Sequence, residues 1–105
     1  MNLHPLTPPK PDVMTRWKLV TSSVRLPANE PIASFKNANK IRQVLARAEA
    51  DVAGADEALL LDSDGNAVEG TTSNFFWIKN GEVQTPPFVA GILPGVTRIV
   101  VFEIC

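Results

Sequence analysis

The sequence has few of the residues on which several common functional sites depend. Only one of its 105 residues is a cysteine and only one is a histidine. Cys105 has no second thiol to pair with, which excludes an internal disulfide framework and a zinc site built on cysteine pairs. His4 has no second imidazole, which disfavours a histidine metal site or a serine–histidine–aspartate triad within the chain. The glycine patterns of two common nucleotide-binding loops, G-x-x-x-x-G-K-[S/T] and G-x-G-x-x-G, are also missing.

An excess of one charge and long hydrophobic runs are absent as well. The formal net charge is −1 and the pI is about 5.7, which gives no electrostatic basis for binding nucleic acid or an anionic membrane. No apolar run reaches the roughly 18 residues of a membrane-spanning helix. Residues 1–20 lack the charged start and apolar core of a signal peptide. We therefore expect a cytoplasmic protein with no nucleic-acid or membrane partner.

The composition is that of an ordinary globular protein. Hydrophobic residues make up 45% and charged residues 20% of the chain, which argues against wholesale disorder. The length corresponds to about one domain. Prolines are concentrated near the N-terminus, and proline is unsuited to helix interiors and central strands. Residues 1–16 are therefore predicted to form a proline-rich linker or arm.

One segment, residues 41–52, has clear helical periodicity. We expect an amphipathic helix with one buried apolar stripe. Asn37 or Asn39 is expected to cap its start, and Gly54 to lie just past its end. The residues of the stripe are Ile41, Val44, Leu45, Ala48 and Val52.

Strands are predicted before and after this helix, so the fold class is α/β (α+β) with a mixed sheet and packed helices. Asn80-Gly81 is expected to form a tight hairpin turn. Residues 96–105 have helical spacing, and the chain stops within that pattern without a cap, which we interpret as truncation. The predicted strands are residues 17–24, 57–62, 67–70, 74–79 and 82–85.

An acidic cluster at Asp62, Asp64 and Asn66 has two interpretations. The cluster is similar to the start of a calcium-binding loop, but the glutamate that closes such a loop is not at the required offset. A β-turn explains the cluster better, because Asp and Asn side chains accept hydrogen bonds from nearby backbone N–H groups.

Three other features could take part in chemistry. Lys36 lies beside Phe35 just before the predicted helix, and partial desolvation there would favour the neutral, nucleophilic amine. Glu69 ends a short strand next to three hydroxyl residues. Thr97 lies at the start of the last helix, where free N–H groups suit a phosphate. Taken singly, each has an ordinary alternative: a solvated lysine, a rim carboxylate and a helix cap.

Taken together and in order, these residues belong to three motifs. The motifs are Lys36–Asn39 running into Val44–Glu49, then Val68–Trp77, then Gly91–Arg98. They resemble the class IV aminotransferases, the fold-type IV pyridoxal 5′-phosphate enzymes, which include D-amino-acid and branched-chain aminotransferases and 4-amino-4-deoxychorismate lyase. The resemblance implies that residues 17–105 are part of the large cofactor-binding domain, truncated at its C-terminus, and that the N-terminal small domain is absent.

The resemblance also implies a role for each candidate residue, with pyridoxal 5′-phosphate as the cofactor. Lys36 matches the lysine that binds the cofactor as an internal aldimine and then moves the α-proton. Glu69 matches the carboxylate that pairs with the pyridine nitrogen. The other implied cofactor contacts are Thr72 and Ser73 beside the ring and Val96 and Thr97 at the phosphate.

The implied reaction is amino transfer from a small amino acid, in an enzyme expected to be a homodimer. Two alternatives are a 4-amino-4-deoxychorismate lyase, which releases pyruvate to give 4-aminobenzoate, and an inactive truncated fragment. The spacing of Lys36 and Asn39 favours the D-amino-acid and lyase branches over the bacterial branched-chain enzymes, and Phe76-Trp77 favours the lyase. Lys40 departs from the family, which has an apolar residue or tyrosine there.

Overall fold

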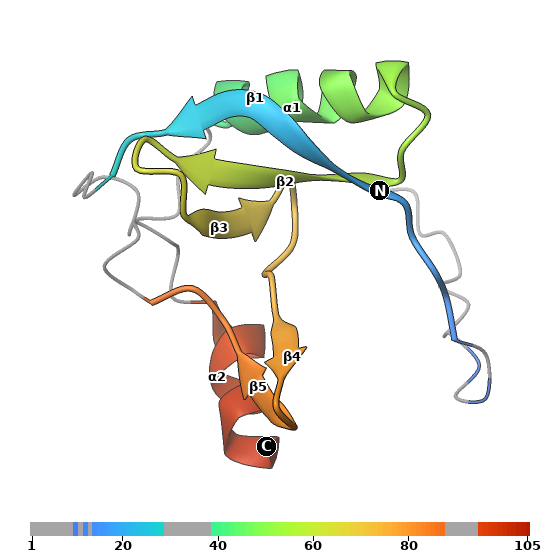
Figure 1. Cartoon of the computed structure of the whole chain (residues 1–105), viewed down its shortest axis with the longest axis vertical. Helices are drawn as coiled ribbons and strands as arrows, with labels where there is room; N and C mark the ends of the chain where they lie inside the picture. The colour runs from blue at the N-terminus through green and yellow to red at the C-terminus, as the bar shows by residue number, and fades with distance from the viewer. Residues whose placement is uncertain (1–9, 11, 13, 29–38, 88–94) are drawn as a thin grey trace, which may run out of the picture.

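The computed structural model describes residues 10, 12, 14–28, 39–87 and 95–105. These residues form helices and strands in a mixed α/β arrangement (Figure 1). The elements in chain order are β1 (Leu19–Leu26), α1 (Ile41–Val52), β2 (Glu57–Asp62), β3 (Ala67–Gly70), β4 (Trp77–Lys79), β5 (Glu82–Gln84) and α2 (Val96–Ile104).

A three-stranded sheet with the order β1-β2-β3 forms the centre of the fold. β1 and β2 are parallel, and β2 and β3 are antiparallel. Parallel neighbours need a crossover connection, and α1 lies in that connection, packed along one face of the sheet (Figure 1). β4 and β5 form a separate antiparallel hairpin near α2. The predicted fold class is thus confirmed.

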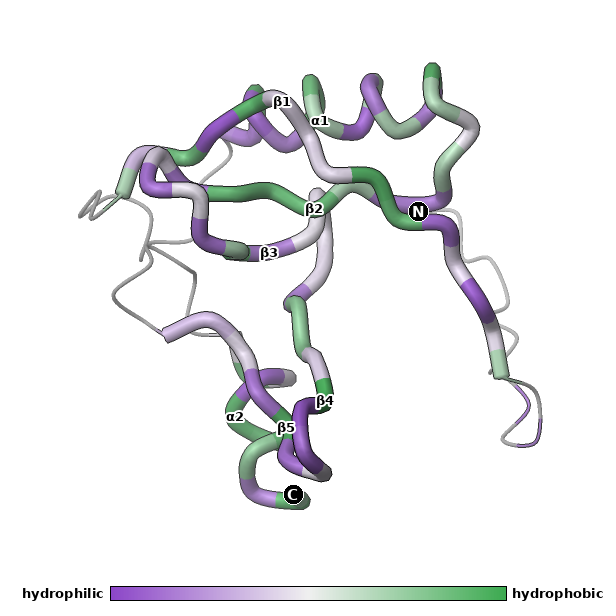
Figure 2. The backbone as a smooth tube through the Cα atoms, in the orientation of Figure 1, coloured by the Kyte–Doolittle hydropathy of each residue, from purple (hydrophilic) through white to green (hydrophobic). Residues whose placement is uncertain are grey.

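Small residues of α1 pack against the sheet. Ala46 and Ala50 are completely buried and belong to the same apolar cluster as Ala58 and Leu60 of β2. β2 is also the most continuous hydrophobic strand of the sheet (Figure 2). Because an alanine side chain ends at Cβ, these two positions allow the helix to lie close to the strands.

The predicted buried stripe of α1 is wrong. Its large members are exposed, from 52% for Leu45 to 91% for Val52, and Ala48 is exposed too. The periodicity identifies a helix with an apolar face but does not say which face meets the sheet. Packing selects the face with Ala46 and Ala50, and the larger apolar side chains point elsewhere.

Hydrogen bonds at Glu49 fix the rotation of α1 about its axis. Its Oε2 accepts a bond from Ser22 Oγ at 2.6 Å and one from Ser23 N at 2.9 Å, and its Oε1 accepts one from Ser23 Oγ. The bonds from Ser22 and Ser23 hold the pKa of Glu49 below its ordinary value. Since Ser22 and Ser23 belong to β1, the same contacts tie helix and sheet together.

The ends of α1 agree only partly with the predicted caps. Ala53 is the C-cap and Gly54 follows it with φ of +62°, so the prediction for Gly54 is confirmed. The N-cap is Lys40, without a side-chain capping bond. Asn39 is therefore not the N-cap, and Asn37 lies outside the described residues.

Two turns connect the strands as the sequence predicts. Asp62 Oδ1 accepts bonds from Asp64 N at 2.9 Å and Asn66 N at 2.8 Å, which makes the acidic cluster a turn. The bond from the Asn66 backbone is the largest influence that holds the pKa of Asp62 below its ordinary value. Asn80 and Gly81 have φ of 54° and 81°, as in the tight hairpin turn expected between β4 and β5.

Strand boundaries differ most at β4. This strand begins at Trp77 and not at Asn74, because Asn74 makes an isolated bridge to Glu69 of β3. The intervening Phe75 and Phe76 connect the sheet to the hairpin. The predicted proline-rich arm lies largely outside the described residues. Neither described helix is long and apolar enough to cross a bilayer.

The close packing of α1 predicts that Ala50→Leu destabilises the protein by about 1–3 kcal/mol, because the larger side chain has to displace β1 or β2. Val52→Leu adds carbon to the same helix at a position that is 91% exposed, and we expect it to change stability by less than about 0.5 kcal/mol. Urea unfolding of both variants measures the two free energies. Equal losses would contradict the assigned orientation of α1.

Candidate active site

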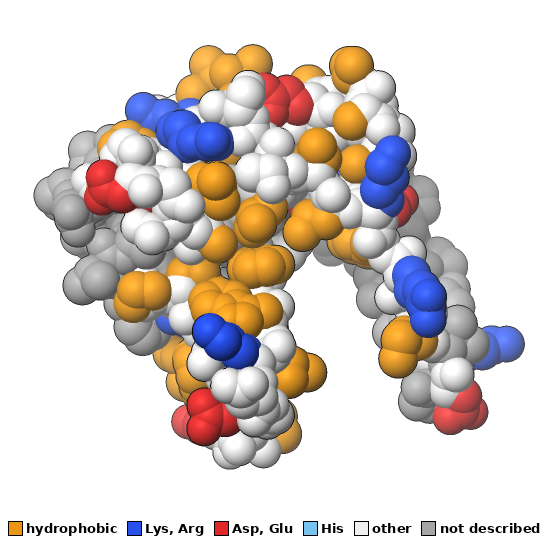
Figure 3. Space-filling model, viewed as in Figure 1, with side chains coloured by type: hydrophobic (Ala, Val, Ile, Leu, Met, Phe, Trp, Pro, Cys, Tyr) orange, Lys and Arg blue, Asp and Glu red, His pale blue; other side chains and the backbone are white. Residues whose placement is uncertain are grey.

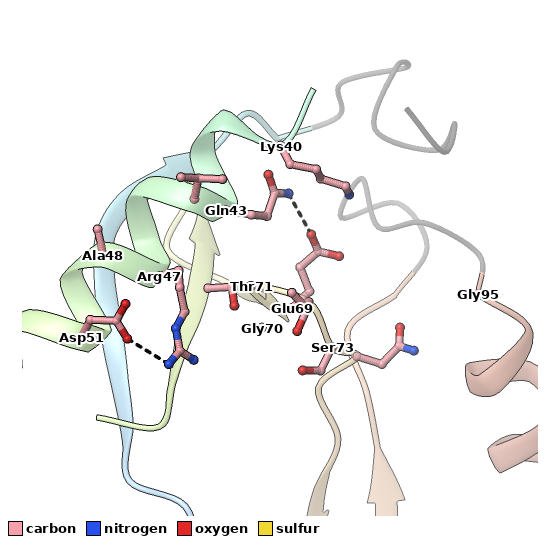
Figure 4. A pocket seen from close by; sticks show the side chains of 13 residues that line it. Lys40, Gln43, Arg47, Ala48, Asp51, Glu69, Gly70, Thr71, Ser73 and Gly95 are labelled. Atoms are coloured by element: carbon pink, nitrogen blue, oxygen red, sulfur yellow. Dashed lines mark hydrogen bonds and ion pairs between the residues drawn. The ribbon is translucent and has the colours of Figure 1, made fainter. Parts of the chain in front are cut away.

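A pocket of about 800 Å³ lies between α1, the end of β3 and the start of α2 (Figure 4). Segments that are far apart in the sequence meet there, which is typical of a ligand site. Its lining residues are Lys40, Gln43, Val44, Arg47, Ala48 and Asp51 from α1 and its N-cap, Glu69 to Asn74 from β3 and the loop after it, and Gly95.

Glu69 contributes a carboxylate to this pocket. It pairs with Leu60 of β2, so its side chain lies on the face of the sheet that α1 covers. Gln43 Nε2 of α1 donates a hydrogen bond of 3.2 Å to Glu69 Oε1 (Figure 4). An amide that donates to one oxygen leaves the other available to a ligand.

The loop after β3 forms the wall next to Glu69. Thr72 and Ser73, predicted from the sequence, both line the pocket. Thr71 is buried and donates to Glu57 of β2, from its N at 3.2 Å and from its Oγ1 at 2.6 Å. Ser73 Oγ donates to the other oxygen of Glu57 at 3.1 Å.

Glu57 is a buried carboxylate with an exposed fraction of 6%. Burial raises its pKa, but the bonds from Thr71, Ala58 and Ser73 together outweigh burial and hold the pKa below the ordinary value. Glu57 is therefore ionised at neutral pH, and its charge is balanced by donors from the pocket wall.

The start of α2 forms the other end of the pocket. Gly95 is the N-cap, with an extended backbone and no side-chain capping bond, so the N–H groups of the first turn, including those of Val96 and Thr97, have no side-chain cap. Such a helix start favours an anion such as phosphate. The side chain of Arg98, which is buried, donates to the carbonyl oxygen of Pro86 and thereby fixes α2 to the segment after β5.

Some of the predicted site residues line this pocket, whereas Val96 and Thr97 follow Gly95 and are not among its lining residues. The structure brings together the predicted Glu69, Thr72 and Ser73 with the start of α2, whereas Lys36 lies outside the described residues. Gln43 and Glu57 were missed. A glutamate between Asp56 and the apolar run of β2 is a weak signal, because a strand end commonly carries a charge, and Gln43 looks like any polar helix residue.

Comparison with known proteins places this arrangement in a family. All of residues 1–105 match the family model described as amino-transferase class IV. The chain belongs to the class IV aminotransferase family. The sequence resemblance is thereby confirmed, and so is the fold, because the similar solved structures below include class IV aminotransferases of fold type IV.

Individual class IV relatives are similar over most of this chain. A protein of Methanocaldococcus jannaschii named "Putative branched-chain-amino-acid aminotransferase" is 46% identical over 88 residues, which are 83% of this chain and 31% of that protein. The structure of the branched-chain aminotransferase of Thermoproteus uzoniensis with norvaline has a TM-score of 0.79 and 32% identity, over 84% of this chain and 30% of that one.

A second branch of the family is also similar in structure. The Legionella pneumophila protein named "Putative 4-amino-4-deoxychorismate lyase" has a TM-score of 0.80 and 30% identity, over 87% of this chain and 34% of that one. This chain thus spans about a third of the length of these relatives. A Salmonella typhimurium protein named "Branched-chain-amino-acid aminotransferase" is 35% identical over 78 residues, which are 74% of this chain and 25% of that protein. The names of both sequence relatives are thus those of branched-chain enzymes, unlike the branches that the spacing of Lys36 and Asn39 favoured.

The described residues fit the cofactor that the family resemblance implies. Pyridoxal 5′-phosphate carries a ring nitrogen that pairs with a carboxylate and a phosphate that binds hydrogen-bond donors. The pocket offers Glu69 on one side and the uncapped start of α2 beside Gly95 on the other. Among the described residues, no group of three or more His, Cys, Asp and Glu side chains is arranged to hold a metal ion.

The lowered pKa of Glu57 predicts acid sensitivity. Above about pH 4.3, the ordinary pKa of glutamate in an unfolded chain, ionised Glu57 stabilises the fold, and this stabilisation is lost as the pH falls from there through the lower folded pKa. Glu57→Gln removes this titration, so between about pH 5 and pH 3 its free energy of unfolding should fall less steeply than that of the wild type. Urea unfolding across this range tests it, and parallel curves would contradict the role of the ionised carboxylate.

Proposed function

We propose that residues 17–105 are part of the cofactor-binding domain of a pyridoxal-phosphate-dependent aminotransferase that acts on a small amino acid. The observation that carries the proposal is the pocket that joins Glu69 to the uncapped start of α2 in a chain of the class IV family. The names of the sequence relatives favour a branched-chain amino acid as the substrate. We further propose a cytoplasmic homodimer with no nucleic-acid or membrane partner.

In this proposal each end of the pocket holds one part of the cofactor. The carboxylate of Glu69 would pair with the ring nitrogen, while Gln43 keeps that carboxylate oriented. Val96 and Thr97 bind the phosphate through N–H groups and the Thr97 hydroxyl, and Thr72 and Ser73 lie beside the ring. When bound, the cofactor supplies an electron sink for the substrate α-carbon.

Lys36 is the proposed nucleophile and proton carrier. A lysine Nζ that is neutral can attack a carbonyl carbon, and the same atom can then take a proton from the substrate α-carbon and return it to another position. These roles require only one amine within reach of both atoms.

A lyase is the second candidate function. The similarity to the Legionella protein supports it, since that structure is as close to this chain as the aminotransferase structure is. The two reactions differ in their products. Transfer of the amino group of leucine to 2-oxoglutarate favours the aminotransferase, and release of pyruvate from aminodeoxychorismate favours the lyase.

The proposed role of Lys36 predicts one covalent adduct. Pyridoxal 5′-phosphate added to the intact protein should give visible absorbance, and borohydride should trap the label on Lys36, as peptide mass spectrometry would show. Lys36→Ala should abolish both signals, whereas Lys40→Ala removes another amine, one that lines the pocket, and should leave the adduct on Lys36 in place. Labelling spread equally over the lysines would overturn the proposal.

The proposed role of Glu69 predicts a loss of turnover. A hydrogen bond to a charged partner contributes about 1.5–3 kcal/mol, so Glu69→Gln should lower kcat/KM by roughly ten- to a hundredfold. Glu82→Gln makes the same change at an exposed position of β5 and serves as the control. Steady-state kinetics of the intact protein measures both. Equal activity of the two variants would contradict the role of Glu69.

A further inference from the structure

Two carboxylates lie on opposite faces of the sheet at the same end of β2 and β3. Ala58 and Leu60 of β2 lie on the face of the sheet that α1 covers. Successive residues of a strand point to opposite faces, so Glu57 lies on the other face. Glu69 pairs with Leu60 and lies on the covered face. Glu69 lines the pocket and Glu57 does not. The loop Gly70–Ser73 lines the pocket together with Glu69 and is hydrogen-bonded to Glu57.

Glu57 binds this loop with both of its carboxylate oxygens. Oε1 accepts two bonds from Thr71, and Oε2 accepts one from Ser73. The backbone N–H of Ala58 donates a further bond of 2.8 Å to Oε1. Thr72 lies between the two bound residues and is exposed on the pocket side, so the bonds to Thr71 and Ser73 set the place of Thr72 as well.

Gly70 closes the loop onto Glu57. Its N–H donates to the carbonyl oxygen of Ser73 at 2.8 Å, which makes the loop a tight turn. A Cβ on Gly70 would lie 3.3 Å from Cδ and Oε2 of Glu57 and equally close to the Ser73 oxygen. These neighbours are a bound carboxylate and a backbone atom, so a larger residue at position 70 would have to shift groups that hold the loop.

We propose that Glu57 is a positioning residue that holds the pocket wall Gly70–Ser73 from behind and thereby sets the affinity of the pocket for its cofactor. An ionised carboxylate only accepts hydrogen bonds, so Thr71 and Ser73 must both direct their donors away from the pocket. The wall then has one arrangement, in which Glu69 and Thr72 face the ligand. The identity of the ligand rests on the proposed function.

Binding of pyridoxal 5′-phosphate to the intact protein tests the proposal. Glu57→Ala should weaken binding roughly tenfold or more, since it removes several bonds to the wall, and Glu57→Gln by a smaller factor, since its carbonyl still accepts from Thr71. The control is Asp62→Ala, which removes another buried carboxylate of β2 that organises a turn at the other end of the strand. It should lower the thermal unfolding midpoint and leave the dissociation constant within about twofold.

Two results of this titration would overturn the proposal. One is a Glu57→Ala protein that binds the cofactor as tightly as the wild type. The other is an Asp62→Ala protein that loses as much affinity as Glu57→Ala, because Glu57 would then act only through overall stability. If Glu57→Ala does not fold, Glu57→Gln decides: weaker binding supports the proposal and unchanged binding overturns it.

Amide hydrogen exchange separates this proposal from the proposed function, because it needs no cofactor. The Thr71 N–H donates to Glu57, so Glu57→Ala should speed its exchange severalfold more than Asp62→Ala does. Glu57→Gln should speed it less, because the carbonyl of Gln still accepts from Thr71. Equal exchange at Thr71 in all proteins would show that Glu57 does not hold the wall. A wild-type protein that binds no pyridoxal 5′-phosphate would overturn the proposed function, and the exchange at Thr71 alone would then decide the role of Glu57.

Discussion

The contact between Glu49 of α1 and the two serines of β1 determines which residues of α1 face the sheet and which face the pocket. It fixes the rotation of α1, so Ala46 and Ala50 meet the sheet and Gln43 and Val44 lie over the end of β3. A helix rotated to bury its larger apolar side chains would carry Gln43 away from Glu69. The orientation of α1 that buries Ala46 and Ala50 is thus the one that brings Gln43 to Glu69, and it leaves the larger apolar side chains of α1 exposed. Other hydrophobic side chains gather on the surface over the sheet and the hairpin (Figure 3).

The sequence predicted those parts of the structure that depend on local chemistry. Gly54 and the Asn80-Gly81 turn need positive φ, and the pattern of residues 57–70 specifies two strands joined by an Asp-based turn. The rotation of α1 was not predictable, because it depends on serines that precede Glu49 by more than twenty residues. The helix cap at Lys40 was missed for a related reason, since a capping motif is only a preference and the chain before α1 need not follow it.

The candidate site shows the same division. Glu69, Thr72 and Ser73 line the pocket, and the sequence pointed to them because a family motif contains them. Gln43 and Glu57 belong to α1 and β2, and they form hydrogen bonds with Glu69 and Thr71 of that motif. These contacts become visible only when β2 pairs with β3 and α1 packs over the sheet. A sequence motif identifies residues that contact a ligand more easily than it identifies the residues that position them.

The joint between the sheet and the hairpin has a mechanical consequence. Glu69 belongs to the sheet, whereas Gly95 is the N-cap of α2, which Arg98 attaches to the segment after the hairpin. The bridge at Asn74 and the short link through Phe75 and Phe76 connect these two parts. A ligand that contacts both Glu69 and the start of α2 links the sheet to the part of the molecule that contains the hairpin and α2. Its binding free energy therefore adds to the stability of the whole molecule, and the angle between the two parts becomes a property of the complex.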